Sequence, residues 1–385
     1  MHIKSKLPQT ETSIFAVMSG LANEYGAINL SQGFPDFPVS RELIDMIHRY
    51  MLAGKNQYAP MPGVPELRQA IADKIFKLYG RKINPDTEIT VTAGATQALF
   101  TAITAVVGQG DEAIIFEPAY DSYDPAIKIN GGVPRYVSLS APDFKIDWDE
   151  VRDMINEKTK LIIVNTPNNP AGFVFEAEDM LRLAEITEGT DIVVISDEVY
   201  EHIIFDGLQH QSALKFDDLY RRTMAVYSFG KTFHATGWKT GYVVAPEELT
   251  VEFRKVHQFN VFSVNTPIQY ALAEYLQDEN HYLSLPAFYQ QKRDFFVGHI
   301  KHPRLKVIPS HGTYFQLLDY SEISRMNEFD FAVWMTKEKG LASIPVSSFY
   351  HDKKNQYILR FAFPKEEETL LKAAQILNNL PDVVL

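Results

Sequence analysis

The chain has 385 residues, 45% of them hydrophobic, and its 37 Lys and Arg against 49 Asp and Glu give a formal net charge of −12. This length supports a large core and two domains, and the acidic balance argues against nucleic acids or anionic membranes as partners. The absence of cysteine excludes disulfides, thiolate nucleophiles and cysteine-ligated metals, so we expect no metal site and a cytoplasmic location. Residues 1–26 lack the apolar core of a signal peptide, and no apolar run has the length of a membrane span.

Short β-branched runs alternate with amphipathic stretches over the first 280 residues. In chain order, the expected elements are helices over 65–79 and 96–107, strands over 113–116 and 161–165, a helix over 177–188, strands over 192–196, 224–228 and 242–245, and helices over 247–259 and 267–277. The strands are apolar almost throughout, which is typical of strands covered on both faces. Strand–helix alternation of this kind predicts an α/β domain with a mainly parallel sheet flanked by helices.

The pattern changes where polarity rises near residues 279–286. A helix over 286–299 is followed by short segments at 304–309, 314–318 and 357–363, and then by a helix over 366–379. This arrangement predicts a smaller α+β domain. We therefore divide the chain into an N-terminal arm that belongs to the small domain (1–35), a large domain (36–280) and a small C-terminal domain (281–385).

Small residues at 92–97 lead into the helix over 96–107, so they would present free backbone N–H groups to a phosphate. The run is neither a P-loop nor a G-x-G-x-x-G fingerprint, which counts against a NAD-dependent dehydrogenase. Tyr120 follows the next buried strand and could stack on a flat heteroaromatic ring, although taken alone a core tyrosine explains it better.

Polar side chains also follow the next two buried strands. Asn169 lies in a rigid turn over 165–172, where its amide could donate to a ligand, although Asn and Pro are also ordinary turn residues. Asp197 ends the strand over 192–196, where open α/β sheets bind their ligands. A buried carboxylate needs a cationic partner such as a protonated pyridine nitrogen, although Asp197 could instead cap a helix. Tyr200 would then lie one helical turn further along, near the same ring.

Lys231 is the most informative residue, because it follows an apolar strand within SFGKTFHATGWKTG (228–241) and is flanked by small residues. A lysine amine in such a pocket can form a Schiff base with an aldehyde, and pyridoxal phosphate is the usual one. Ser228 and Lys239 supply the hydroxyl and the cation that its phosphate needs. Alone, the segment could also be an ordinary glycine-bounded loop.

Together these motifs resemble the class I/II (fold type I) pyridoxal-phosphate aminotransferases over nearly the whole chain. The likeness is strongest to the branch of bacterial methionine aminotransferases and kynurenine aminotransferases. It rests on NLSQGFPDFP (29–38), Gln57-Tyr58, the turn over 165–172, DEVY (197–200) and the lysine segment 228–241. Two departures from the general pattern, Lys239 in place of arginine and His234 in place of a small residue, also resemble the methionine group.

The resemblance implies a role for each candidate residue. Lys231 would form the Schiff base, Asp197 would pair with the pyridinium, and Tyr120 would stack on the ring. Tyr200 and Asn169 would hold the ring oxygen. The phosphate would be bound by the backbone of Ala95 and Thr96, by Ser228 and Lys239, and by Tyr58 from the partner subunit of a homodimer. The substrate would be bound by Arg360, which would contact its α-carboxylate, and by Gly33 and Phe15.

The implied reaction transfers the amino group of an L-amino acid to a 2-oxo acid by a ping-pong mechanism. The donor would be of the methionine, aromatic, histidine, glutamine or kynurenine type. A cysteine-conjugate C–S β-lyase would share every cofactor residue, so these motifs leave it open; release of ammonia would identify it. A pyridoxal-phosphate-binding regulator would need an extra DNA-binding domain, and roughly 30 residues before the first matching motif are too few for one.

Overall fold

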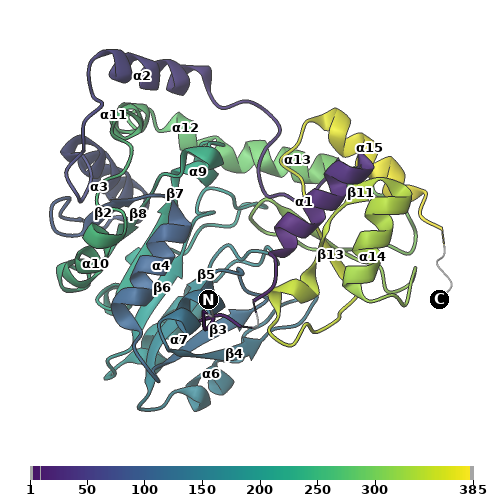
Figure 1. Cartoon of the computed structure of the whole chain (residues 1–385), viewed down its shortest axis with the longest axis horizontal. Coiled ribbons are helices and arrows are strands. Elements are labelled where there is room, and N and C mark those ends of the chain that lie inside the picture. Colours follow the sequence, from purple (N-terminus) through teal and green to yellow (C-terminus); the bar gives the residue numbers. More distant parts are fainter. Residues whose placement is uncertain (1–2, 9, 382–385) are drawn as a thin grey trace.

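The computed structural model describes residues 3–8 and 10–381, and its centre is a seven-stranded sheet (Figure 1). The strand order is β2-β8-β7-β6-β5-β3-β4, and every pair is parallel except the two made by β8. The strands are β2 (Ile89–Thr92), β3 (Glu112–Glu117), β4 (Val133–Ser138), β5 (Thr159–Asn165), β6 (Val193–Asp197), β7 (Thr223–Ser228) and β8 (Gly241–Val244). The prediction of a mainly parallel sheet in an α/β fold is confirmed.

Helices cover both faces of this sheet, as the apolar strands predicted. Alternate residues of β3 show this directly: Ala113 and Ile115 share a core cluster with α4 (Ala95–Val106), α5 (Tyr123–Ile129) and α10 (Glu247–Asn260). Ile114 and Phe116 belong to a second cluster with α6 (Trp148–Met154) and α7 (Ala177–Thr187). Successive residues of a strand point to opposite faces, so β3 is buried on both faces.

The helix expected over 65–79 is α3 (Pro65–Tyr79), with the same bounds. Pro65 occupies its first turn, where no N–H is needed, and Gly80 ends it in the left-handed conformation at φ 73°. The helices around it and beyond are α2 (Arg41–Leu52), α8 (Asp217–Tyr220), α9 (Phe229–Thr232), α11 (Thr266–Tyr275), α12 (Asn280–Leu283) and α13 (Leu285–His299).

A second, antiparallel sheet lies in the C-terminal part of the chain, with the order β12-β13-β10-β9. Its strands are β9 (Lys306–Ile308), β10 (Phe315–Asp319), β12 (Ile344–Pro345) and β13 (Ile358–Ala362), and its helices are α14 (Glu328–Trp334) and α15 (Glu367–Asn378). This is the expected smaller α+β unit. The three-part division of the chain stays a prediction, and its outer parts include residues 1–2, 9 and 382–385, which lie outside the described residues.

The N-terminal segment lies among these C-terminal elements rather than on the large sheet. In Figure 1, α1 (Ile14–Tyr25) lies among these elements and packs against the helical segment Met335–Lys339 that follows α14, and β1 (Ile28–Asn29) pairs in parallel with β11 (Leu341–Ala342). The following segment, which we call the strap (residues 30–36), is held there by hydrogen bonds that include three from residues 362–366. The acceptors of these three are the Leu30 carbonyl (2.8 Å from the Ala362 N–H), the Phe34 carbonyl (2.8 Å from Lys365 Nζ) and Asp36 Oδ1 (2.7 Å from the Glu366 N–H).

Several elements escaped the sequence patterns for identifiable reasons. β4 is an edge strand with mostly exposed or half-buried residues, and β2 has four residues, of which two are threonine. Neither shows a long apolar run, although both pair with neighbours in the large sheet. None of the helices in the described part of the chain is long and apolar enough to cross a lipid bilayer.

Candidate active site

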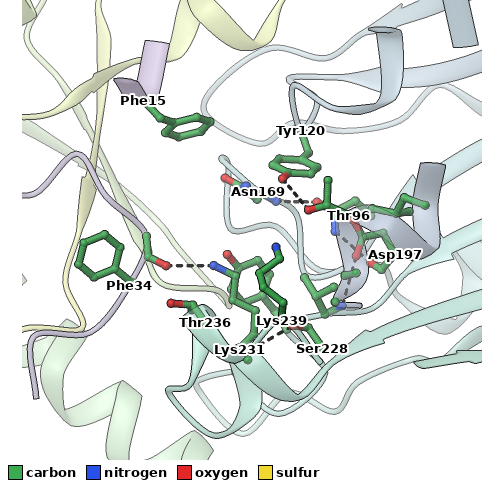
Figure 2. Close-up of a pocket in the computed structure, with 18 of the residues that line it drawn as sticks. Phe15, Phe34, Thr96, Tyr120, Asn169, Asp197, Ser228, Lys231, Thr236 and Lys239 are labelled. Carbon is green, nitrogen blue, oxygen red and sulfur yellow. Dashed lines mark hydrogen bonds between the residues drawn. The ribbon is translucent and has the colours of Figure 1, made fainter. Parts of the chain in front are cut away.

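The carboxyl ends of three neighbouring strands open into a cavity of about 250 Å³ (Figure 2). Asn165 at the end of β5 is in register with Asp197 at the end of β6, and β7 ends beside them at Ser228. Because parallel strands end at the same edge of a sheet, the fold brings together these polar side chains from separate parts of the chain. The strap and β13 of the antiparallel sheet close the opposite side, through Gly33 and Arg360.

Lys231 lies in the short helix α9, directly after β7. Its Nζ donates to the Gly33 carbonyl at 3.0 Å and lies 5.6 Å from the centre of the Tyr200 ring. Burial, together with the nearby cations Arg360 and Lys239, lowers the pKa of the Lys231 amine to about 8. A lysine in this state loses its proton readily near neutral pH, which a nucleophile or a general base requires.

Asp197 is 3% exposed, and one of its carboxylate oxygens, Oδ2, accepts a hydrogen bond from the Tyr123 hydroxyl at 2.6 Å. The other oxygen, Oδ1, accepts only a long contact of 3.4 Å from the Val199 N–H. Burial raises the pKa of Asp197 to about 6, although the Tyr123 hydrogen bond acts against this rise. The negative charge of Asp197 therefore has few partners within the protein, and a cationic ligand would supply the missing partner.

Arg360 lies in the middle of β13 and is 1% exposed. Its Nη1 donates to Asn169 Oδ1 at 2.8 Å and its Nη2 to the Ser31 carbonyl at 2.9 Å, while its Nε has no partner among the described residues. The guanidinium lies 3.8 Å from the centre of the Phe315 ring and 5.2 Å from that of Phe15. Burial lowers the pKa of Arg360 to about 9, so the side chain remains charged at neutral pH.

The sheet side of the cavity has the features of a phosphate site. Gly94 precedes α4 at φ 81° and ψ 171°, and α4 begins at Ala95 without any side-chain cap. Its first N–H groups are therefore free to bind an anion at the positive end of the helix. Ser228 Oγ accepts the Lys231 N–H at 3.3 Å, which leaves its own proton for a ligand, and Lys239 lies on the same side of the cavity (Figure 2).

The remaining lining residues that we predicted frame the middle of the cavity. Tyr120 and Phe15 lie opposite Lys231 in Figure 2, and the Tyr120 hydroxyl is 3.2 Å from Thr96 Oγ1. Tyr200 is 2% exposed and lies in a turn rather than one helical turn beyond Asp197. Asn169 is oriented by Arg360, because accepting through Oδ1 leaves its amide N–H groups for another partner.

Gly33 and Tyr58 differ in how they relate to the cavity. Gly33 lines it, and a Cβ atom at this position would lie 2.7 Å from the Phe315 ring, so only glycine fits so close. Tyr58 does not line it; the side chain is 83% exposed and packs edge-on against Phe262 at 5.6 Å between ring centres. Every other predicted site residue lines the cavity.

Sequence reasoning assigned no role to three residues that the fold places at the site: Tyr123, Asn165 and Phe315. Asn165 carried a usable signal, because it ends a buried strand as Asp197 does. Tyr123 lies three residues after Tyr120, which in a helical turn places both on one side. Phe315 had no such signal, since its role depends on Arg360 from the neighbouring strand β13.

The charges of the cavity favour an anionic ligand with a cationic centre. Three cations line it, Lys231, Lys239 and Arg360, and Asp197 is the one carboxylate among its lining residues in the described part of the chain. The cations lie at separate places, so a ligand can present an aldehyde, a phosphate and a carboxylate to different groups. Such a division suits a phosphorylated carbonyl cofactor together with an amino acid or oxo acid.

Comparisons with known proteins agree with this chemistry. Residues 25–377 match the family model of aminotransferase class I and II. The methionine aminotransferase of Escherichia coli is 50% identical over 378 residues, covering 98% of both chains. Human kynurenine–oxoglutarate transaminase 1 is 36% identical, with 91% of both chains covered.

Solved structures give the same result. An Escherichia coli crystal structure with a methionine aminotransferase function superposes with a TM-score of 0.97 at 50% identity, covering 99% of this chain and 100% of that one. The N-succinyldiaminopimelate aminotransferase of Mycobacterium tuberculosis superposes with a TM-score of 0.94 at 35% identity, covering 98% and 100%. The chain therefore belongs to the class I and II aminotransferases, enzymes of fold type I that depend on pyridoxal 5′-phosphate.

Proposed function

We propose that this aminotransferase takes its amino group from L-methionine or a similar uncharged L-amino acid and passes it to a 2-oxo acid. The observation that carries the proposal is the charge pattern of the cavity. Of the three cations among the described residues that line the cavity, Arg360 comes from the strap side, while Lys231 and Lys239 come from the sheet side with the proposed cofactor contacts. A donor with a second carboxylate would therefore lack a cationic partner for it, and burying it unpaired is costly.

The residues present fit pyridoxal phosphate. The uncapped start of α4, with Ser228 and Lys239, would hold the phosphate; Asp197 would hold the pyridine nitrogen; Tyr120 would lie against the ring. Tyr200 and the free amide of Asn169 would hold the ring oxygen. When bound, the cofactor supplies an aldehyde that takes up the amino group and a ring that withdraws electrons from the substrate.

The protein's own groups would then bind the donor and move its proton. Arg360 offers the donor's α-carboxylate its unpartnered Nε, and its other nitrogens are fixed by Asn169 and the Ser31 carbonyl. A planar guanidinium held in this way fixes the orientation of the carboxylate. Lys231, with its pKa lowered to about 8, is the base that would move the proton at the donor's Cα.

The walls beyond Arg360 favour an apolar donor side chain. Phe15 and Phe34 line the cavity on the strap side. Thioether sulfur makes favourable contacts with aromatic rings, and a flexible unbranched side chain fits an irregular space. Methionine is therefore the donor of choice, and the name of the Escherichia coli relative supports it.

A half-reaction tests this proposal. The cofactor-loaded protein is mixed with L-methionine alone, and the oxo acid and ammonia are both quantified. We expect one oxo acid per site without ammonia, and continued turnover only when a 2-oxo acid is added. Continuous release of ammonia would instead identify a C–S lyase, and faster half-reaction with L-aspartate than with L-methionine would contradict the proposed donor.

We further propose a homodimer in which Tyr58 completes the phosphate site of the partner subunit. Tyr58 lies outside its own cavity, and the neighbouring Phe262 and Phe259 are 48% and 88% exposed. Exposed aromatic side chains gathered in one place are typical of a protein–protein interface. The hydroxyl of Tyr58 would add one hydrogen bond to the phosphate across this interface.

A hybrid dimer tests whether Tyr58 acts in the site of the partner subunit or in that of its own chain. Tyr58→Phe should weaken cofactor affinity about tenfold, the effect of one hydrogen bond to a charged group. In a hybrid of one Tyr58→Phe chain and one Lys231→Ala chain, the intact Lys231 site receives Tyr58 from the other subunit and should regain wild-type affinity. If Tyr58 acted within its own chain, the hybrid would keep the weakened affinity.

A further inference from the structure

Tyr123 is a buried phenol whose hydroxyl faces the most important carboxylate of the site. It is 2% exposed, begins α5 and donates to Asp197 Oδ2 at 2.6 Å. The ring itself belongs to the apolar cluster beneath α4. A phenylalanine would satisfy that packing equally well, so the hydroxyl calls for a separate explanation, because a buried hydroxyl costs free energy unless it is hydrogen-bonded.

Tyr123 is always the donor and Asp197 the acceptor in this hydrogen bond. Burial raises the pKa of the Tyr123 phenol well above its ordinary value, so the hydroxyl keeps its proton and acts as a donor. Asp197 is its one acceptor among the described residues. The hydrogen bond therefore stabilises the ionised carboxylate, and it occupies Oδ2 so that Oδ1 is the oxygen with unused acceptor capacity.

The backbone of Asp197 is fixed as well. Its carbonyl accepts the Thr166 N–H at 3.1 Å and Asn165 Nδ2 at 2.9 Å, both from the neighbouring strand end. The one freedom left to the carboxylate is rotation of the side chain, and Tyr123 removes it. Tyr120 packs edge-on against Tyr123 at 5.7 Å between ring centres, so the residue proposed to face the cofactor ring also supports Tyr123.

We propose that Tyr123 is a positioning residue for the cofactor: its hydroxyl keeps Asp197 ionised and turns Oδ1 toward the pyridine nitrogen. This inference rests on the cofactor placement proposed above. Tyr123 touches neither the substrate nor the cofactor in this role and acts through Asp197. Its effect should therefore depend on the pyridine nitrogen, whereas a purely structural effect would not.

A pair of cofactors separates these cases. The apoprotein is titrated with pyridoxal phosphate and with 1-deazapyridoxal phosphate, in which a C–H group replaces the ring nitrogen, and the dissociation constants are compared. Tyr123→Phe should weaken binding of pyridoxal phosphate about tenfold and leave binding of the deaza analogue unchanged. Tyr220→Phe is the matched control, because it removes another hydrogen bond from a buried phenol to a carboxylate, 2.7 Å to Glu88, and neither residue lines the cavity. Tyr220→Phe should change the dissociation constant of neither pyridoxal phosphate nor the deaza analogue.

The outcomes distinguish the inference from the placement on which it rests. If the wild type binds both cofactors equally, Asp197 does not meet the ring nitrogen, and the placement is wrong. The wild type could prefer pyridoxal phosphate while Tyr123→Phe weakens the binding of both cofactors to the same degree, or of neither. In that case Tyr123 has only a structural role. Should Tyr123→Phe fail to fold, Tyr123→His, which keeps an N–H donor, and Tyr123→Leu, which has none, repeat the comparison; only the histidine variant should retain the preference.

Discussion

Asp197 and Glu198 are adjacent in sequence, equally buried, and belong to two regions that are built differently. Glu198 accepts hydrogen bonds from Ser196, Tyr227 and the Ala213 N–H, each at 2.9 Å, and contacts His210 at 2.8 Å. Asp197 has one short hydrogen bond and one long contact. The carboxylate with a full set of partners serves the fold, whereas the one with unused capacity faces the cavity.

The same contrast extends to the basic residues. Behind Glu198, Lys74 and Glu201 form a buried ion pair that Tyr79 completes with a hydrogen bond of 2.5 Å to Glu201. We call Lys74, Glu198, Glu201 and His210 the buried ionic cluster. Within the cavity, Arg360 keeps a buried Nε without a partner among the described residues. In the ionic cluster His210 Nδ1 also lacks a partner among the described residues, but the charged groups with unused hydrogen-bonding capacity in this comparison, Asp197 and Arg360, both face the cavity, and the predictions below test that difference.

The largest effect is expected from Lys231→Ala. Removing the amine that is proposed to hold the cofactor's aldehyde and to act as the general base should lower kcat for L-methionine about 10⁴-fold. Steady-state transamination rates measure it. Lys231→Arg serves as the control for charge, because it keeps a cation but no amine that can lose its proton at neutral pH; it should be equally inactive. Activity retained in either variant would contradict the role of Lys231.

Lys74→Met should instead affect stability, because it leaves the Glu201 carboxylate buried without its cation. Breaking one side of a buried pair costs about 3–5 kcal/mol, which urea titration of the apoprotein would show as a lower free energy of unfolding. Lys77 on the same helix pairs with Glu279, and both side chains are largely exposed. Lys77→Met should therefore cost less than about 1 kcal/mol. Equal losses would remove the distinction between the two pairs.

Arg360→Lys should weaken use of the donor while sparing the cofactor. Lysine keeps the charge but not the fork held by Asn169 and Ser31, so kcat/KM for L-methionine should fall about 100-fold. Cofactor affinity, measured by titration of the apoprotein, should stay near that of the wild type. Arg293→Lys, which alters an arginine that binds Asp206 outside the cavity, should change neither quantity. A matching loss of cofactor affinity would place Arg360 in the cofactor site.

The smallest effect is expected from Asp197→Asn, and it is a gain in stability where the preceding variants lose stability or activity. The pKa of Asp197 in the folded apoprotein, about 6, lies above its unfolded value, so the folded state binds this proton more tightly. Ionisation of Asp197 therefore destabilises the apoprotein as the pH rises from about 4 through 6. Asp197→Asn should raise the free energy of unfolding at pH 8 by about 1–3 kcal/mol, and the gain should vanish near pH 4.

Glu201 should show the opposite dependence of stability on pH, measured at the same pH values as for Asp197. Burial alone would raise its pKa, but the Lys74 ammonium, His202 and Tyr79 lower it to about 2. Its stabilising contribution is complete above its unfolded pKa and is lost as the pH falls toward 2. Glu201→Gln should therefore destabilise the protein at pH 8. If Asp197→Asn destabilised it as well, the two regions would not differ in the way proposed.

The fold could be predicted from the sequence where local signals were strong. α3 was predicted to the residue by its proline, its glycine and its apolar face, and the buried strands by their uninterrupted apolar runs. The edge strand β4 was missed, because its solvated side removes that signal. The cytoplasmic location, the domain boundaries and the dimer stay predictions.

The candidate site was predictable to the extent that its residues carry their own chemistry. Lys231 and Asp197 bear charge in unusual places, so they stood out, whereas Arg360 was assigned through the family resemblance. Tyr123 did not, because its meaning depends on a carboxylate 74 residues away in sequence. The prediction that Asp197 and Tyr200 are one helical turn apart was wrong, because the chain makes a turn there and not a helix.

The pairing of β1 with β11 has a consequence for how the enzyme matures in the cell. During synthesis, Lys231 and Asp197 leave the ribosome well before β11, β13 and α15, which hold the strap and carry Arg360. Until these elements are made, the nascent chain lacks both the partners that hold the strap and Arg360, the proposed receptor of the α-carboxylate. The strap is made early but can be held in place only after these late elements, and we expect a chain truncated before β13 to lose recognition of the amino acid.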